Sequence, residues 1–219
     1  MHSLPFVKVC CISSVREAQL AIACGASALG LVSHMPSGPG VIDEALIAEI
    51  LQTVPSHIAT FLLTSEQSAD LIVAQHRRCP TTAIQLCEQI LPEVHSKLRR
   101  ALPEVQLVQV IHVRDERSVE EARNASEHVD AILLDSGNLD LIIKELGGTG
   151  RVHDWSISRT ICETVNVPVF LAGGLNANNI RAAILEVGPY GVDLCSGVRT
   201  DKHLDETKLK AFFKELKIG

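Results

Sequence analysis

Short, mostly apolar segments alternate with longer amphipathic segments along this chain, and the pair occurs eight times in 219 residues. Apolar strands separated by helices are typical of a parallel sheet that is covered by helices. In one of the longer segments, Ile180, Ala183, Ile184 and Val187 repeat at the spacing of a single helix face. Eight such units predict an α/β fold, a (β/α)8 TIM barrel that occupies residues 1–219 as a single domain.

Caps and apolar runs set the expected boundaries of these segments. Ser14 and Glu17 have the spacing of a capping box, and Gly25 is placed to end the first helix. Gly188 and Pro189 end the seventh helix. We expect strands over 6–10, 28–32, 58–63, 83–86, 105–111, 131–134, 167–171 and 192–194, helices over 43–54, 66–77, 90–101, 119–127 and 155–164, a seventh helix beginning near Asn176, and a last helix that buries Leu209, Phe212, Phe213 and Leu216.

The competing fold is an open, doubly wound sheet. That fold would place a G-x-G-x-x-G turn after the first strand, where this chain has Cys10-Cys11-Ile12-Ser13. Aromatic residues make up only 3% of the chain, so branched aliphatic residues must fill the core, as they do inside parallel barrels. The closed barrel is therefore the better prediction.

Charge and cysteine usage limit the partners and the compartment. A net charge of −6 with scattered Lys and Arg argues against a nucleic-acid surface. No apolar run reaches the ~18 residues of a membrane span, and no secretory signal opens the chain. We therefore expect a cytoplasmic protein whose seven cysteines are reduced thiols. No C-x-x-C pair and no His pair at i, i+4 occurs, so no metal site is expected.

Residues that could carry chemistry follow several predicted strands, at the end of the barrel where active sites lie. Cys10 ends the first strand, and Asp135 follows the sixth. Backbone N–H groups can converge on a phosphate where no Cβ interferes, so glycine-rich loops at these positions predict a phosphate site. Three such loops follow the sixth, seventh and eighth strands: Gly147-Gly148-Thr149-Gly150, Gly173-Gly174 and Ser196-Gly197.

Each of these residues also has a purely structural interpretation. The glycines could serve only tight turns between strand and helix, although three clusters together favour phosphate. Asp135 could cap a turn instead of acting as an acid or base. Cys10 could be a buried, inert thiol, and Asp193, which lies inside a strand, could make structural hydrogen bonds.

These motifs resemble, in order and spacing, those of the phosphoribosylanthranilate isomerase family of tryptophan biosynthesis, over nearly the whole chain. Lys8-Val9-Cys10-Cys11-Ile12-Ser13 is similar to the family's K-[IV]-C-G-[IL]-[TS]. The other matching segments are Gln85-Leu86 (Q-L-H-G), Leu133-Leu134-Asp135 (L-L-D), Gly147-Gly148-Thr149-Gly150 followed by Asp154-Trp155 (G-G-[ST]-G and D-W), Leu171-Ala172-Gly173-Gly174-Leu175, and Val192-Asp193 followed by Ser196-Gly197-Val198.

The resemblance implies a barrel of the ribulose-phosphate-binding type that isomerises N-(5-phosphoribosyl)anthranilate to 1-(2-carboxyphenylamino)-1-deoxyribulose 5-phosphate, an Amadori rearrangement without metal or cofactor. It implies that Asp135 is the general acid and Cys10 the general base. The Cys10 pKa should then be lowered and the Asp135 pKa raised. The residues implied to bind the phosphorylated sugar substrate are Gly148, Gly150, Gly173, Gly174, Ser196 and Gly197 for the phosphate, and Lys8, Gln85 and Asp193 for other parts.

Departures from the family's pattern leave alternatives open. The family holds the aromatic carboxylate with an Arg in the loop after the second strand, but here that loop reads Ser37-Gly38-Pro39-Gly40. Cys11 replaces the family's Gly, Cys87 follows the Q-L pair, and Arg199 is a candidate substitute for the absent Arg. The alternatives are a paralogous isomerase acting on another phosphorylated sugar, and a non-catalytic barrel that binds a phosphate ligand.

Overall fold

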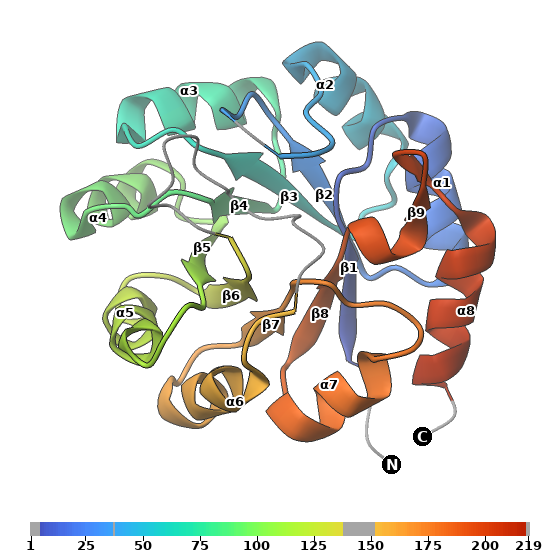
Figure 1. Ribbon diagram of the computed structural model, residues 1–219. Coiled ribbons are helices and arrows are strands. Elements are labelled where there is room, and N and C mark those ends of the chain that lie inside the picture. Colours follow the sequence, from blue (N-terminus) through green and yellow to red (C-terminus); the bar gives the residue numbers. More distant parts are fainter. Residues whose placement is uncertain (1–4, 37, 138–151, 218–219) are drawn as a thin grey trace.

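Eight parallel strands form a closed barrel in the computed structural model, which describes residues 5–36, 38–137 and 152–217. The strands pair in chain order, and β1 closes the barrel by pairing with β8 (Figure 1). The helices surround the strands, and α8 lies against α1 where the two ends of the barrel meet. This architecture confirms the predicted (β/α)8 fold.

Strand and helix alternate along the described chain from β1 to β8. The strands of the barrel are β1 (Phe6–Val9), β2 (Ala28–Val32), β3 (Ala59–Thr64), β4 (Ala83–Leu86), β5 (Gln106–His112), β6 (Ala131–Asp135), β7 (Val169–Leu171) and β8 (Gly191–Leu194). The helices are α1 (Val15–Cys24), α2 (Glu44–Thr53), α3 (Ala69–Arg78), α4 (Pro92–Ala101), α5 (Arg117–Ser126), α6 (Trp155–Thr164), α7 (Ile180–Val187) and α8 (Glu206–Leu216). A 3-10 turn, η1 (Ser196–Val198), and a small antiparallel hairpin of β9 (Arg199–Thr200) and β10 (His203–Leu204) lie between β8 and α8.

Alternate residues of each strand point to opposite sides of the barrel wall, because side chains alternate along a strand. Phe61 and Leu63 of β3 belong to the apolar cluster inside the barrel. Leu62, between them, belongs to the larger cluster that packs the strands against the helices. The protein therefore has two apolar layers, one inside the barrel and one between the strands and the helices.

Local sequence signals explain the start and end of α1. The Ser14 side chain accepts a hydrogen bond from the Glu17 N–H at 3.1 Å, as a helix N-cap does. Gly25 ends the helix with φ of 114°, a left-handed conformation that favours glycine. Both caps were predicted, but the Glu17 carboxylate accepts from the N–H of Ser13 instead of the N-cap residue itself.

Some predicted helix starts are displaced. The helix expected from residue 66 begins at Ala69, because the Thr64 hydroxyl accepts from the Glu66 N–H and holds a turn there. The helix expected from residue 90 begins at Pro92, since proline suits the first helical position.

The prediction of a seventh helix beginning near Asn176 is wrong. The Asn179 side chain accepts from the Asn176 N–H at 2.8 Å, and the Asn176 side chain accepts from the Asn178 N–H at 2.9 Å. These side-chain bonds stabilise a turn in competition with a helix, which then starts at Ile180. The hairpin of β9 and β10 was not predicted, since strands of two residues carry no apolar pattern. In the described ranges 5–36, 38–137 and 152–217, no helix is long and apolar enough to cross a membrane.

Candidate active site

The polar residues predicted for the site share one side of the barrel wall. Lys8 lies between Val7 and Val9, and Asp193 lies between Val192 and Leu194; all four apolar neighbours face the helices. Lys8 and Asp193 consequently point into the barrel, and the same alternation turns Gln85 inward. Further along their strands, the same alternation directs Cys10 and Asp135 inward as well.

A pocket opens at the C-terminal ends of the strands and brings most of the predicted residues together. Leu63, Cys87 and Val32 form part of its wall. The predicted site residues that line it are Cys10, Gln85, Asp135, Gly173, Gly174, Asp193 and Ser196. Gly148 and Gly150 lie outside the described residues. The described part of the chain gathers no group of three or more His, Cys, Asp and Glu side chains that could hold a metal ion.

Lys8 lies beneath the pocket, not in its lining. Its side chain is fully buried, and its Nζ lies 2.8 Å from Oδ2 of Asp193. The strand register produces this ion pair, because Lys8 of β1 is aligned with Asp193 of β8. The ammonium also lies over the Phe61 ring, 5.3 Å from its centroid. Burial opposes the charge of Lys8, but the Asp193 carboxylate raises the Lys8 pKa overall, so Lys8 is a permanent buried cation.

Cys10 is 5% exposed and lies just above this cation. A hydrogen bond from the Cys11 side chain lowers the pKa of Cys10, and the positive charge of Lys8 acts in the same direction against the effect of burial. The Cys10 pKa therefore lies below its ordinary value, as a thiolate base requires. The neighbouring Cys87 thiol has a raised pKa, chiefly because it is buried.

Asp135 ends β6 and is 8% exposed at the pocket. One of its carboxylate oxygens, Oδ1, accepts from the Ser136 N–H at 2.7 Å. Its carbonyl oxygen accepts from the Val113 N–H at 2.9 Å, which ties the end of β6 to the chain after β5. Asp135 thus supports its own turn and also faces the pocket, so its two sequence-based interpretations are compatible.

The glycine loops after β7 and β8 lie side by side at one edge of the pocket. Gly173 and Gly174 have φ of 84° and 65°, a left-handed backbone conformation that favours glycine. Gly197 packs against the first loop so closely that a Cβ would lie 2.0 Å from the Leu175 carbonyl oxygen. The two loops therefore need glycine for their shape, and they leave backbone groups facing the pocket.

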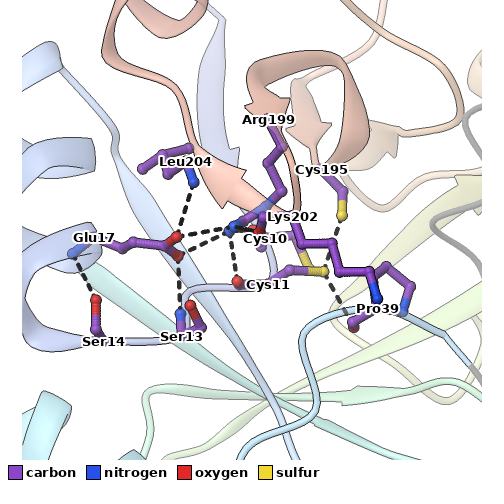
Figure 2. Close-up of polar contacts among 10 residues, drawn as sticks. All are labelled: Cys10, Cys11, Ser13, Ser14, Glu17, Pro39, Cys195, Arg199, Lys202 and Leu204. Atoms are coloured by element: carbon purple, nitrogen blue, oxygen red, sulfur yellow. Dashed lines mark hydrogen bonds and ion pairs between the residues drawn. The ribbon is translucent and has the colours of Figure 1, made fainter.

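Arg199 does not point into the pocket. Its Nη1 lies 3.0 Å from Oε1 of Glu17, and both side chains are buried, with 7% and 10% exposure. Its Nη2 donates to the carbonyl oxygens of Cys10 and Cys11 at 3.2 and 2.5 Å, as Figure 2 shows. Burial would raise the Glu17 pKa, but hydrogen bonds from Arg199, Leu204 and Ser13 lower it overall. Arg199 accordingly supports the turn that carries Cys10 from behind, and the hypothesis that it replaces the loop Arg is wrong for this structure.

Sequence reasoning missed this Arg199–Glu17 pair, because its members are 182 residues apart. The capping-box signal identified Glu17 only as a local residue of α1. The fold and the site define a (β/α)8 barrel of the ribulose-phosphate-binding type, with a thiol of lowered pKa, a carboxylate and two glycine loops at one mouth.

Comparisons with known proteins identify the family. Residues 7–215 match the sequence profile of N-(5'phosphoribosyl)anthranilate (PRA) isomerase. N-(5'-phosphoribosyl)anthranilate isomerase 2 of Methanosarcina mazei is 36% identical over 96% of this chain and 93% of its own length. The N-(5'-phosphoribosyl)anthranilate isomerase of Methanocella arvoryzae is 31% identical over 97% of this chain and 98% of its own length. The chain belongs to the phosphoribosylanthranilate isomerase family.

Solved structures agree with this assignment. The phosphoribosyl anthranilate isomerase of Thermotoga maritima superimposes with a TM-score of 0.83 at 27% identity, over 96% of this chain and 98% of that one. A second phosphoribosyl anthranilate isomerase structure, in complex with reduced 1-(o-carboxyphenylamino)-1-deoxyribulose 5-phosphate, has a TM-score of 0.80 at 26% identity. The match covers 96% of this chain and 97% of that one.

Proposed function

We propose that this protein catalyses the Amadori rearrangement of N-(5-phosphoribosyl)anthranilate to 1-(2-carboxyphenylamino)-1-deoxyribulose 5-phosphate. The observation that carries the proposal is the presence of Cys10 and Asp135 in one pocket, beside two glycine loops suited to phosphate. The family membership and the product analogue bound by a structural relative support the same substrate.

Asp135 is the proposed general acid. It donates a proton to the ring oxygen of the sugar, the bond from that oxygen to C1 breaks, and the nitrogen lone pair forms the C=N bond of a Schiff base. Asp135 must hold a proton before this step, and its small exposed fraction, 8%, keeps it largely out of bulk water.

Cys10 is the proposed general base. Its thiolate removes the proton from C2, and the electron pair of that C–H bond forms C1=C2 while the C=N electrons return to nitrogen. The resulting enolamine then gains a proton at C1 and loses one from its hydroxyl, which yields the ketone. Lys8 is fully buried and absent from the pocket lining, so in place of the predicted contact with substrate we propose that its positive charge stabilises the Cys10 thiolate.

The phosphate is proposed to lie against Gly173, Gly174, Ser196 and Gly197, with Gly148 and Gly150 completing its site. Several backbone N–H groups at one place bind an anion without requiring a buried side-chain charge. Gln85 and Asp193 line the deeper part of the pocket, where they would contact the sugar hydroxyls. We further propose that residues 1–219 form one domain and that the protein works in the cytoplasm.

An assay of purified protein with freshly prepared phosphoribosylanthranilate tests the proposal through the loss of substrate fluorescence. Cys10→Ser and Asp135→Asn should each lower kcat by about 10²–10⁴, the usual contribution of an acid or base. Matched controls are Cys24→Ser, at the end of α1 and outside the pocket lining, and Asp115→Asn, whose carboxylate is exposed and paired with Arg117. Absence of turnover in the unmodified protein would refute the activity, and an unimpaired Cys10→Ser variant would refute the assignment of the base.

A further inference from the structure

Cys11 and Cys195 bring their sulfur atoms to 2.9 Å although they are 184 residues apart in the chain. Cys11 follows the end of β1 and Cys195 follows the end of β8, and these strands are neighbours in the closed barrel. The register that pairs Val9 with Leu194 places Cys195 beside Cys10, and the turn at Cys11, whose φ is 61°, brings the Cys11 sulfur to Cys195. A disulfide requires an S–S distance of about 2.05 Å, so the two sulfurs need to approach by less than about 1 Å.

From this geometry we propose that Cys11 and Cys195 form a reversible disulfide at the rim of the active-site pocket, and that the bond switches the site off. Formation of the bond does not depend on the proposed function, whereas its effect on turnover rests on it.

The Cys11 side chain has little freedom to move. Cys11 is a non-glycine residue with φ of 61°, and its side chain is 4% exposed. Gly40 packs against it so closely that a Cβ there would lie 2.4 Å from the Cys11 Cβ. The Cys11 thiol donates to the Pro39 carbonyl oxygen at 3.5 Å, on one side, and contacts Cys195 on the other (Figure 2). With so little freedom, the two thiols lose little conformational entropy when they join.

Cys195 provides access for an oxidant. It is partly exposed, and it lines both the active-site pocket and the adjoining groove beside Ser13 and His203. A low-molecular-weight disulfide such as glutathione disulfide can therefore reach its sulfur. Arg199 lies near both thiols: burial opposes its charge, but Glu17 and the thiolate forms of Cys11 and Cys195 raise the Arg199 pKa. Hydrogen bonds with Cys10 and Cys195 raise the pKa of the Cys11 thiol, and burial adds to the rise, so the first attack on the small disulfide falls to the more exposed Cys195.

The exchange is balanced in two steps. The Cys195 thiolate attacks the small disulfide, forms a mixed disulfide and releases one thiolate. The Cys11 sulfur, after losing its proton to solvent, attacks the Cys195 sulfur and releases the second thiolate. Two protein thiols are thus oxidised, and one small disulfide is reduced to two thiols.

The bond would remove the only S–H proton of Cys11. The Cys11 thiol donates to the Pro39 carbonyl oxygen in the loop after β2, and a hydrogen bond with the Cys11 side chain helps to lower the Cys10 pKa. Oxidation should therefore raise the Cys10 pKa and release the loop. Each unit of such a rise lowers the thiolate fraction at neutral pH, and kcat/KM with it, by up to about tenfold.

Mass spectrometry of the intact protein after incubation with glutathione disulfide tests whether the bond forms. We expect the loss of two hydrogens, a fall in titratable thiols from the seven of the sequence to five, and a Cys11–Cys195 cross-linked peptide in a non-reducing digest. Dithiothreitol should reverse all three changes. Cys195→Ser and Cys11→Ser should prevent the cross-link, while the matched control Cys24→Ser should form it. A cross-link that involves Cys10, or only mixed disulfides with glutathione, would overturn the proposal.

Turnover measurements on the same samples test the switch. The oxidised protein should show a lower kcat/KM at neutral pH, and the acid side of its pH–activity profile should shift to higher pH. The Cys195→Ser variant should lose no activity when it is treated with the oxidant. Full activity of cross-linked protein would overturn the switch. If the reduced protein does not turn over phosphoribosylanthranilate at all, the proposed function fails, and the cross-linked peptide still decides whether the bond forms.

Discussion

The guanidinium of Arg199 donates to the carbonyl oxygen of Cys11 at 2.5 Å, and the same group forms a buried ion pair with Glu17. Arg199 begins β9, directly after the loop of η1, and Glu17 lies in the first turn of α1. The pair thus connects the loop proposed to bind phosphate with the turn that carries the proposed base. Loss of the Arg199–Glu17 ion pair is therefore expected to loosen both the loop and the turn.

Arg199→Met should lower the free energy of unfolding by about 3 kcal/mol, because it leaves the Glu17 carboxylate buried without its partner. Urea denaturation measures this change. Arg181→Met is the matched control, since Arg181 forms an ion pair with Glu215 that is 45% and 34% exposed; we expect a loss below about 1 kcal/mol there. Equal losses in the two variants would contradict the structural role of Arg199.

Lys8→Met should raise the Cys10 pKa, because it removes the buried positive charge that stabilises the thiolate. The rate at which iodoacetamide alkylates Cys10 at neutral pH, followed by peptide mass mapping, should fall about tenfold for each unit of the rise. Lys210→Met, on the exposed face of α8, is the control for the loss of a lysine. An unchanged alkylation profile in Lys8→Met would show that Lys8 does not tune Cys10.

Gly197→Ala should disturb the phosphate site, since its Cβ would meet the Leu175 carbonyl oxygen at 2.0 Å and push the two glycine loops apart. We expect a loss of about 1–3 kcal/mol in stability and a smaller rise in melting temperature on addition of inorganic phosphate. Gly188→Ala is the control, because Gly188 has φ of 65° but open space around it. The Gly188→Ala variant should be less stable, but phosphate should raise its melting temperature as much as that of the unmodified protein. An equal rise in both variants would show that Gly197 does not contribute to the phosphate site.

Acidification should destabilise the protein partly through His153. Burial lowers the His153 pKa to about 4, and the ring lies 2.7 Å from the Ser158 hydroxyl. The unfolded chain binds a proton at His153 more readily than the folded protein does. The contribution of neutral His153 to the free energy of unfolding is therefore complete above about pH 6.5 and is lost as the pH falls toward 4.

His153→Gln should therefore lose less stability than the unmodified protein between pH 7 and pH 4.5, by on the order of 2 kcal/mol after allowance for partial exposure. Urea denaturation at several pH values measures the difference. His57→Gln, at an exposed position, is the control. Parallel pH curves for the unmodified protein and His153→Gln would exclude this contribution.

Much of the candidate site could be predicted because its signals are local. Strand alternation alone turns Lys8, Gln85 and Asp193 inward, and the strand ends place Cys10 and Asp135 at the same mouth. The pocket confirms that Cys10 and Asp135 lie together. The start of α7 was missed, although its cause is also local: the side chains of Asn176 and Asn179 form a turn that precedes the helix.

The sequence by itself determined the eight strand–helix units, the direction in which each strand side chain points and the position of the glycine loops, because these depend on periods of two and 3.6 residues and on neighbouring residues. Only the tertiary structure decided that Arg199 supports the Cys10 turn from behind instead of reaching substrate, and that Cys11 meets Cys195. Both contacts arise where the last strand of the barrel closes against the first. Residues more than 180 positions apart become neighbours there, and no local pattern records which of their side chains will touch.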